Sequence, residues 1–216
     1  MVRQLGNQYV STLGEEIANS ISHGVMTVLA LAAVPFVAVW GFTQYGMVEA
    51  VSLSIYATCL FLMFAVSTLY HSLNEGKAKD IFHLLDHIFI YVLIAGCYTP
   101  ASLSIIGGVK GIILVSLQWA IVLFGILYKT LVKNQNQKVS LAIYLAMGWS
   151  IIFFIKDLYT NASTAFIVWI AIGGIMYTIG AIIYGKKGFK FHHFVWHLFI
   201  NLAAICQFIG FVFCLK

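Results

Sequence analysis

The sequence predicts an all-α membrane protein built as a bundle of seven transmembrane helices. Two observations support this fold class. Hydrophobic residues make up 62% of the 216 residues and charged residues 9%, whereas a soluble domain carries about 25% charged residues. Seven stretches are also apolar over roughly the 20 residues that a helix needs to cross the hydrocarbon. We therefore expect lipid, rather than water, to surround most of this chain.

The apolar stretches follow one another without a Pro/Ser-rich linker, so we expect a single domain over residues 1–216. Residues 1–18 are polar and acidic, which predicts a cytoplasmic amino-terminal segment and no cleavable signal peptide. Pro35 and Pro100 fall inside apolar stretches, where neighbouring helices satisfy the freed carbonyl groups. The expected spans are 19–42, 48–72, 81–106, 111–132, 139–155, 162–184 and 192–215.

Short turns and interfacial side chains mark the boundaries of these spans. Spans three and four are separated only by the turn around Gly107, Gly108 and Lys110, and span five is the shortest. Aromatic residues near span ends are typical of the belts that anchor helices at the headgroups. Such residues here are Trp40, Tyr45, Tyr128 and Tyr159.

The distribution of lysine and arginine predicts the orientation, because cytoplasmic loops carry an excess of these residues. Most of the 12 basic residues fall in inner segments if the amino terminus is cytoplasmic. We therefore predict a cytoplasmic amino terminus and, because the number of spans is odd, an external carboxyl terminus. The inner basic residues are Arg3, Lys77, Lys79, Lys129, Lys133, Lys138, Lys186, Lys187 and Lys190, and the outer ones are Lys110, Lys156 and Lys216.

The net charge of +5 does not indicate nucleic acid as a partner. The lysines lie in short loops between spans rather than on a basic face with interleaved aromatic residues. The four cysteines, Cys59, Cys97, Cys206 and Cys214, lack paired ligand spacing, so we expect neither a disulfide nor a zinc-finger framework. The expected partners are membrane lipids, and the sequence leaves the oligomeric state open.

All seven histidines fall on the predicted cytoplasmic side. His23 lies at the start of span one and His71 at the end of span two. The other five lie at the starts of two spans: His83 and His87 in span three, and His192, His193 and His197 in span seven. A single histidine at a membrane interface is ordinarily an anchor whose ring is hydrated by water and headgroups. Ionisable residues inside the apolar boundary are costly enough to be candidates for function.

Helical spacing favours one set of metal ligands. His193 and His197 are four residues apart and project from one helix face. His71 completes a set of three imidazoles, and zinc with three protein ligands keeps its fourth position for water. Asp86 and Ser67 are expected to support that water or orient a ligand. We rank His83 with His87, and Asn19 with His23, as interface anchors, although spacing alone does not exclude them.

Five segments together form a recognisable set of motifs: 15–24 (EEIANSISHG), 67–71 (STLYH), 85–87 (LDH), 94–100 (IAGCYTP) and 193–197 (HFVWH). These motifs resemble those of the bacterial hemolysin III family, which is similar to the progestin and adipoQ receptor family and more distantly to the alkaline ceramidases. The resemblance implies a seven-helix bundle with Zn²⁺ held by His71, His193 and His197 on the cytoplasmic side. It also implies that Asp86 and Ser67 support a water molecule there, in a protein of the bacterial plasma membrane.

Three functions remain open at this point. The first is a zinc-dependent, ceramidase-like hydrolase of lipid amide or ester bonds at the inner leaflet, with Asp86 accepting a proton. The second is a receptor or membrane-homeostasis protein in which zinc is structural. The third is cytolysis, although the predominantly apolar spans four and six argue against a pore made by a single chain.

Overall fold

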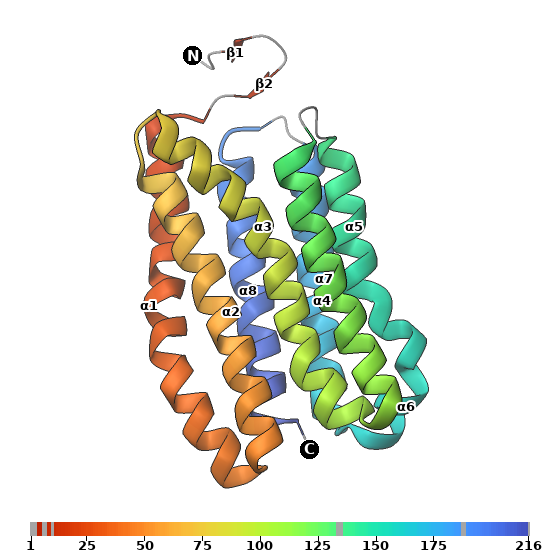
Figure 1. The fold of residues 1–216 in the computed structure, drawn as a ribbon. Helices are drawn as coiled ribbons and strands as arrows, with labels where there is room; N and C mark the ends of the chain where they lie inside the picture. Colours follow the sequence, from red (N-terminus) through yellow and green to blue (C-terminus); the bar gives the residue numbers. More distant parts are fainter. Residues whose placement is uncertain (1–3, 6–7, 10, 133–135, 187–188, 216) are drawn as a thin grey trace.

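The seven expected spans are present in the computed structural model. It describes residues 4–5, 8–9, 11–132, 136–186 and 189–215. Seven helical segments of this part of the chain are long and apolar enough to cross a membrane. The expected fold class is therefore confirmed. The helices stand side by side, with α1 beginning at one end of the bundle and α8 ending at the other (Figure 1).

The elements follow the predicted order. The chain begins with a short antiparallel pair of strands, β1 (Gln4–Leu5) and β2 (Gln8–Tyr9). The first three helices are α1 (Leu13–Gln44), α2 (Met47–Ser72) and α3 (Lys77–Pro100), and a π-helical segment (Ala101–Ile106) continues α3. The next three are α4 (Gly108–Leu131), α5 (Gln137–Trp149) and α6 (Ile155–Asn161). The last two helices are α7 (Thr164–Lys186) and α8 (His192–Phe213). All four cysteines are free, as expected.

Helix α1 begins six residues earlier than the expected span, inside the predicted amino-terminal segment. The reason is a capping box at its start. The Thr12 side chain accepts from the Glu15 backbone N–H, and the Glu15 carboxylate accepts from the Thr12 backbone. Two of the backbone donors that a helix start leaves unpaired are satisfied in this way. Glu15 and Glu16 therefore belong to the first turn of α1 instead of preceding the helix.

The fifth span is longer than expected because it is interrupted. It runs over Gln137–Asn161, with a 3₁₀ stretch at Ser150–Phe154 between α5 and α6. Side chains of neighbouring spans satisfy the backbone there. The Tyr98 hydroxyl donates to the Gly148 carbonyl and accepts from the Ile151 N–H, both at 2.8 Å. Broken helices persist at membrane depth when such partners exist.

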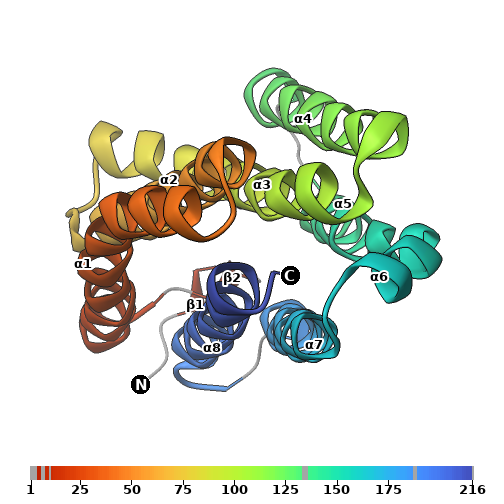
Figure 2. The ribbon, with the colours of Figure 1, turned by 90° about the horizontal axis from the view of Figure 1, so that it is seen from below.

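The packing order explains which helices can share a site. Helix α1 packs against α2 and α8, α2 packs against α3, and α7 packs against α8. Seen along the bundle, α4 lies outside α3, on the side away from α8 (Figure 2). Helices α2, α3 and α8 therefore face a common interior, while α4 contributes to the periphery.

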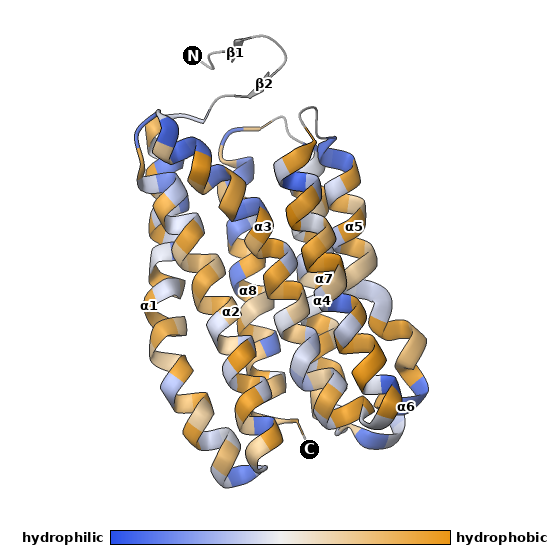
Figure 3. Ribbon diagram, in the orientation of Figure 1, coloured by the Kyte–Doolittle hydropathy of each residue, from blue (hydrophilic) through white to orange (hydrophobic). Residues whose placement is uncertain are grey.

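The two ends of the bundle differ in character. Hydrophobic residues dominate the middle of the helices, and hydrophilic residues gather most densely where α1 begins (Figure 3). We call this end, formed by the starts of α1, α3 and α8 and the end of α2, the histidine end. It also holds six of the predicted inner lysines: Lys77, Lys79, Lys129, Lys138, Lys186 and Lys190.

The other end of the bundle, where α1 and α8 finish, is called the opposite end. It holds Lys110 and Lys156. Arg3, Lys133, Lys187 and Lys216 lie outside the described residues. The segregation of lysines to one end agrees with the predicted direction of insertion, and that direction stays a prediction.

Candidate metal centre

Helix α2 and two helices that run antiparallel to it, α3 and α8, bring the predicted site residues to the histidine end. His71 lies in the last turn of α2, Asp86 in the third turn of α3, and His193 and His197 in the first two turns of α8. Ser67 lies one turn before His71 on the same helix. Because α2 ends where α3 and α8 begin, residues far apart in sequence reach one depth of the bundle.

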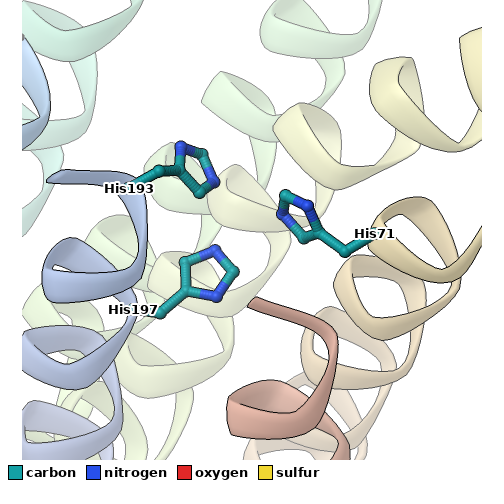
Figure 4. Close-up of side chains that lie close together, drawn as sticks. All are labelled: His71, His193 and His197. Atoms are coloured by element: carbon teal, nitrogen blue, oxygen red, sulfur yellow. The ribbon is translucent and has the colours of Figure 1, made fainter. Parts of the chain in front are cut away.

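His71, His193 and His197 form a compact triangle (Figure 4). Their ring centroids are 5.0, 5.0 and 4.7 Å apart. One ring nitrogen from each lies within 4.8 Å of the other two. Tetrahedral zinc at about 2.0–2.1 Å from each nitrogen requires ligand nitrogens about 3.3 Å apart, so modest rotation of the rings would close the triangle around an ion.

The nitrogen atoms of this triangle have the chemistry that zinc requires. Among the described residues, the Nε2 atoms of His71, His193 and His197 are all buried and lack a hydrogen-bond partner. Buried polar atoms in proteins are rarely left without a partner. Three such atoms that converge from two helices fit a metal ion, which would bind the three lone pairs.

The tautomer of His71 is fixed by a contact with α1. Its Nδ1 lies 3.1 Å from Oε2 of Glu16, which also accepts from Nζ of Lys79 at 3.1 Å. An ionised carboxylate only accepts hydrogen bonds, so a neutral His71 ring carries its proton on Nδ1 and a lone pair on Nε2. A carboxylate behind a ligating histidine is a common arrangement at zinc sites, where it orients the ring and raises its basicity.

His197 is held in the same tautomer by α1. The Ser22 hydroxyl donates to the Asn19 carbonyl at 2.8 Å, which leaves its oxygen to accept from Nδ1 of His197 at 3.3 Å. The His23 ring stacks on the His197 ring, with centroids 3.6 Å apart and planes 3° apart. Helix α1 therefore orients two of the three imidazoles.

Asp86 and Ser67 lie beside the triangle. Asp86 is 6% exposed and Ser67 is 1% exposed. The Asp86 carboxylate lies close to the Ser67 side chain and to the His71 ring. The structure thus brings together all five residues that the sequence selected, and their roles in metal binding and catalysis stay predictions.

An apolar cavity of about 330 Å³ extends from this site along the interior of the bundle. Asp86, His23 and His193 line its head. From there it passes between α3, α5, α7 and α8 and reaches Gln207 and Leu158. Its walls are mostly hydrophobic side chains, so it suits a chain-like apolar molecule better than a polar one.

The remaining histidines fall into different classes. His192 is not in the triangle: its Nδ1 lies 3.2 Å from the Phe189 carbonyl oxygen, and the neighbouring His193 supplies the ring nitrogen there. His83 is exposed and its ring packs on Tyr70, as an interface anchor would. His87 lines the cavity.

The interface interpretation is wrong for Asn19 and His23. They are 0% and 1% exposed, and the Asn19 side chain and both ring nitrogens of His23 have no partner among the described residues. Sequence reasoning also missed Glu16 and Ser22, which orient His71 and His197. The available signal was the position of the EEIANSISHG segment at the end of the bundle that holds all the histidines.

Known proteins are similar to this chain in sequence. The family model described as haemolysin-III related matches residues 11–208. A hemolysin-3 homolog of Bacillus subtilis is 37% identical over 206 residues, which covers 95% of this chain and 97% of that protein. Hemolysin-3 of Bacillus cereus is 37% identical over 187 residues, covering 86% and 85%. The human monocyte to macrophage differentiation factor is 28% identical over 207 residues, covering 91% and 83%. No solved structure matches the chain.

These similarities and the seven spans agree with the resemblance drawn from the motifs. The human relative extends it to the progestin and adipoQ receptor group. The bacterial relatives and the apolar helices indicate a multi-pass protein of the bacterial plasma membrane. Because the family model covers nearly the whole chain and two bacterial relatives are 37% identical over most of their length, the protein belongs to the haemolysin-III-related family.

Proposed function

We propose that this protein is a zinc-dependent hydrolase of lipid amide or ester bonds at the inner leaflet. The observation that supports the proposal most is the position of the histidine triangle. Three buried Nε2 atoms without hydrogen-bond partners among the described residues lie beside a buried carboxylate, at the head of an apolar cavity. A polar reaction centre and an apolar chain-binding space therefore adjoin.

The residues divide the work in a simple way. His71, His193 and His197 would hold the zinc ion, and Glu16 and Ser22 keep two of these rings in the binding tautomer. When bound, zinc supplies Lewis acidity that polarises a carbonyl group and acidifies a water molecule. Asp86 accepts the proton of the attacking water and then delivers it to the leaving amine or alcohol. Ser67 orients the Asp86 carboxylate.

The cavity supplies binding and exclusion of water. An acyl chain that enters it would place its carbonyl near Asp86 and His193, because these residues line the head of the cavity. The apolar walls recognise chain length rather than headgroup chemistry, so the headgroup would remain at the membrane surface. Lipid amides and esters share this form, with a polar carbonyl at the head of a long apolar chain.

Metal content tests the first half of the proposal. Elemental analysis of the purified protein should find one zinc per chain in the parent and none in His71→Ala or His193→Ala. His83→Ala is the matched control, since His83 is exposed and outside the triangle. A parent protein without stoichiometric divalent metal would contradict the proposal.

Turnover tests the second half. Release of free fatty acid from long-chain amides and glycerol esters in vesicles should be measured for the parent, Asp86→Asn and the exposed control Asp80→Asn. We expect Asp86→Asn to lower turnover by about 10²–10⁴-fold, as the loss of a general base does, while zinc content stays unchanged. Full activity in Asp86→Asn would remove Asp86 from the mechanism.

A structural zinc in a receptor-like or membrane-homeostasis protein is the second candidate. It is favoured by one observation: the ligands come from α2 and α8, which share little direct contact because α1 packs against both. A metal there would join two helices. Under this alternative, chelation lowers the melting temperature strongly and no lipid mixture shows turnover.

Cytolysis, the activity in the names of the two Bacillus relatives, has weaker structural support. Helices α4 and α7 present long runs of exposed apolar side chains, including Ile112, Leu123, Val168 and Ile175. A water-filled pore needs polar faces along several spans. Release of a dye from vesicles by the purified protein, at a rate unchanged by chelation, would favour this function over the hydrolase.

A further inference from the structure

A second polar cluster lies deep in the bundle, away from the histidine end. It is formed by Tyr56 on α2, Cys97 on α3, Tyr177 on α7 and Gln207 on α8, and we call it the mid-bundle cluster. Tyr56 and Tyr177 both lie near Cys97, and Sγ of Cys97 donates to Oε1 of Gln207 at 3.1 Å. Four different helices therefore contribute to one polar spot.

The cluster is incomplete as a hydrogen-bond network. Among the described residues, the hydroxyl groups of Tyr56 and Tyr177 are buried and have no partner. The Gln207 carbonyl oxygen accepts from Cys97, and its amide nitrogen is a donor that can meet a ligand. An unpaired buried hydroxyl costs about 1–3 kcal/mol, so two of them together indicate a missing partner.

The cluster opens on the same cavity as the histidine triangle. Cys97, Tyr177 and Gln207 all line this cavity. A Cβ atom on Gly173, one turn from Tyr177, would lie 2.8 Å from the Gln207 side chain, so α7 and α8 approach closely at this depth. A molecule lying along the cavity from its head would therefore pass the mid-bundle cluster.

Helix geometry gives the distance between the two polar spots. Gln207 follows His197 by ten residues and Cys97 follows Asp86 by eleven, which places Gln207 and Cys97 about 15–17 Å from the residues of the histidine end along their helices. That depth is near the middle of a hydrocarbon core about 30 Å thick. Polar groups at such a depth are costly and commonly mark function.

We infer that the mid-bundle cluster is a second binding subsite, which recognises a hydroxyl or keto group in the middle of an acyl chain. The inference rests on the proposed function, in that the acyl carbonyl lies at the histidine triangle. A saturated chain built from C–C bonds of about 1.5 Å advances about 1.3 Å per carbon, so the oxygen atom belongs about 12 carbons from the carbonyl. The preferred ligand is a mid-chain oxygenated acyl chain.

The physical basis of this preference is the cost of leaving the Tyr177 hydroxyl unpaired at the cavity wall. A plain chain covers the Tyr177 hydroxyl and the Gln207 amide with methylene groups and pairs with neither. A mid-chain hydroxyl accepts from the Gln207 amide nitrogen and donates to the Tyr177 hydroxyl. Sites built around buried polar groups discriminate strongly against ligands that lack the matching group.

Competition binding tests the inference without requiring turnover. The protein in phosphatidylcholine nanodiscs is loaded with tritiated stearate, which is then displaced by unlabelled stearate, 12-hydroxystearate or 18-hydroxystearate. We expect 12-hydroxystearate to bind about tenfold more tightly than stearate, the ratio that one well-formed hydrogen bond of about 1.4 kcal/mol gives. The 18-hydroxy isomer has the same formula but carries its oxygen beyond the cluster, so it should show no such preference.

Two variants and one control locate the preference. Tyr177→Phe and Gln207→Leu should each reduce the tenfold ratio to below about threefold, because each removes one of the paired groups. Tyr159→Phe makes the same chemical change on a tyrosine that is 83% exposed and should keep the full ratio. Equal affinities for the three acids in the parent, or a ratio that survives both variants, would overturn the subsite and leave the cluster as a place for water alone.

The same measurement separates this inference from the proposed function. Both acids carry the same carboxylate, so the binding free energy that the carboxylate gains at the histidine triangle cancels in the ratio of their affinities. A tenfold ratio in a protein that holds no zinc and cleaves no lipid would uphold the subsite and remove the hydrolase. Zinc-dependent turnover with equal affinities would do the reverse.

Discussion

Long polar side chains at the opposite end of the bundle, such as Trp40 and Lys110, pair with other groups of the protein. Trp40 Nε1 donates to the Val212 carbonyl at 2.9 Å, and Lys110 pairs with Asp157 at 2.8 Å. At the histidine end, by contrast, several buried polar side chains lack hydrogen-bond partners among the described residues. Asn19, His23, His71, His193 and His197 all keep buried polar atoms without partners among the described residues. Among the described residues, the first end leaves two separate serine hydroxyls without partners, those of Ser102 and Ser104, whereas the second gathers one amide and four imidazoles in a single cluster.

This contrast shows where the membrane protein accepts a cost in order to bind a ligand. In lipid a polar group without a partner costs more than at a wet surface, because no bulk water reaches it. At the opposite end that cost is limited to the hydroxyls of Ser102 and Ser104 among the described residues. The chain accepts the cost at the histidine end, where a metal ion would satisfy three of the open atoms at once.

The largest expected effect comes from removing one vertex of the triangle. His197→Ala should lose all zinc, because two imidazoles and no third ligand do not hold the ion at physiological concentration. Elemental analysis of the purified variant gives the result. Retention of a full equivalent of zinc would show that the open atoms serve another ligand and that the contrast between the ends has another cause.

Chelation should lower stability by an amount set by the zinc concentration. A protein held at 100 times its zinc dissociation constant gains about 2.7 kcal/mol from the ion. Removing it should lower the melting temperature by about 5–10 °C for a chain of this size. His71→Ala should show no such shift, and a shift of the same size in that variant would mean that the chelator acts elsewhere.

Glu16→Gln should weaken zinc binding without abolishing it. The amide no longer supplies a charged acceptor to Nδ1 of His71, and the loss of such an outer partner typically costs about 10–100-fold in affinity. Titration with a competing zinc indicator measures the change. Glu75→Gln is the matched control, because the Glu75 side chain is 90% exposed and lies 3.8 Å from Lys79. Equal losses in both variants would remove Glu16 from the site.

The fold was largely predictable because lipid leaves few alternatives. Every apolar stretch of about 20 residues must be a helix that satisfies its own backbone, so seven stretches give seven spans. The boundaries were less predictable. The capping box at Thr12 and the support that Tyr98 gives to the break after Trp149 depend on side-chain contacts that periodicity does not encode.

The candidate site also has a part that the sequence predicts and a part that it does not. The predicted ligands follow from helix geometry, since His193 and His197 share a face and α2 ends where α8 begins. The contribution of α1 was missed because it depends on which face that helix turns inward. Glu16, Ser22 and His23 of α1 contact the imidazoles of the triangle only through packing between helices. The sequence of an apolar helix with scattered polar residues does not show which of its faces turns inward.

The smallest effects are expected from a Lys→Gln substitution, which can be made at both ends of the bundle. Lys110→Gln removes an ion pair whose lysine side chain is 65% exposed, and such pairs contribute about 0.2–1 kcal/mol. Lys110 also lies in the first turn of α4, where a positive charge is unfavourable by about 0.3–1 kcal/mol. The two contributions oppose each other, so the melting temperature should change by less than about 2 °C and zinc content should not change.

Lys79→Gln makes the same change at the histidine end, where Nζ donates to both Glu16 and the Leu73 carbonyl at 3.1 Å. Glu16 keeps its contact with His71 in this variant, so zinc affinity should fall by at most about tenfold, the lower limit for an outer partner. The indicator titration used for Glu16 measures both lysine variants. A larger loss in Lys110→Gln than in Lys79→Gln would mean that the two ends are coupled through the bundle, because no direct contact joins Lys110 to the triangle among the described residues.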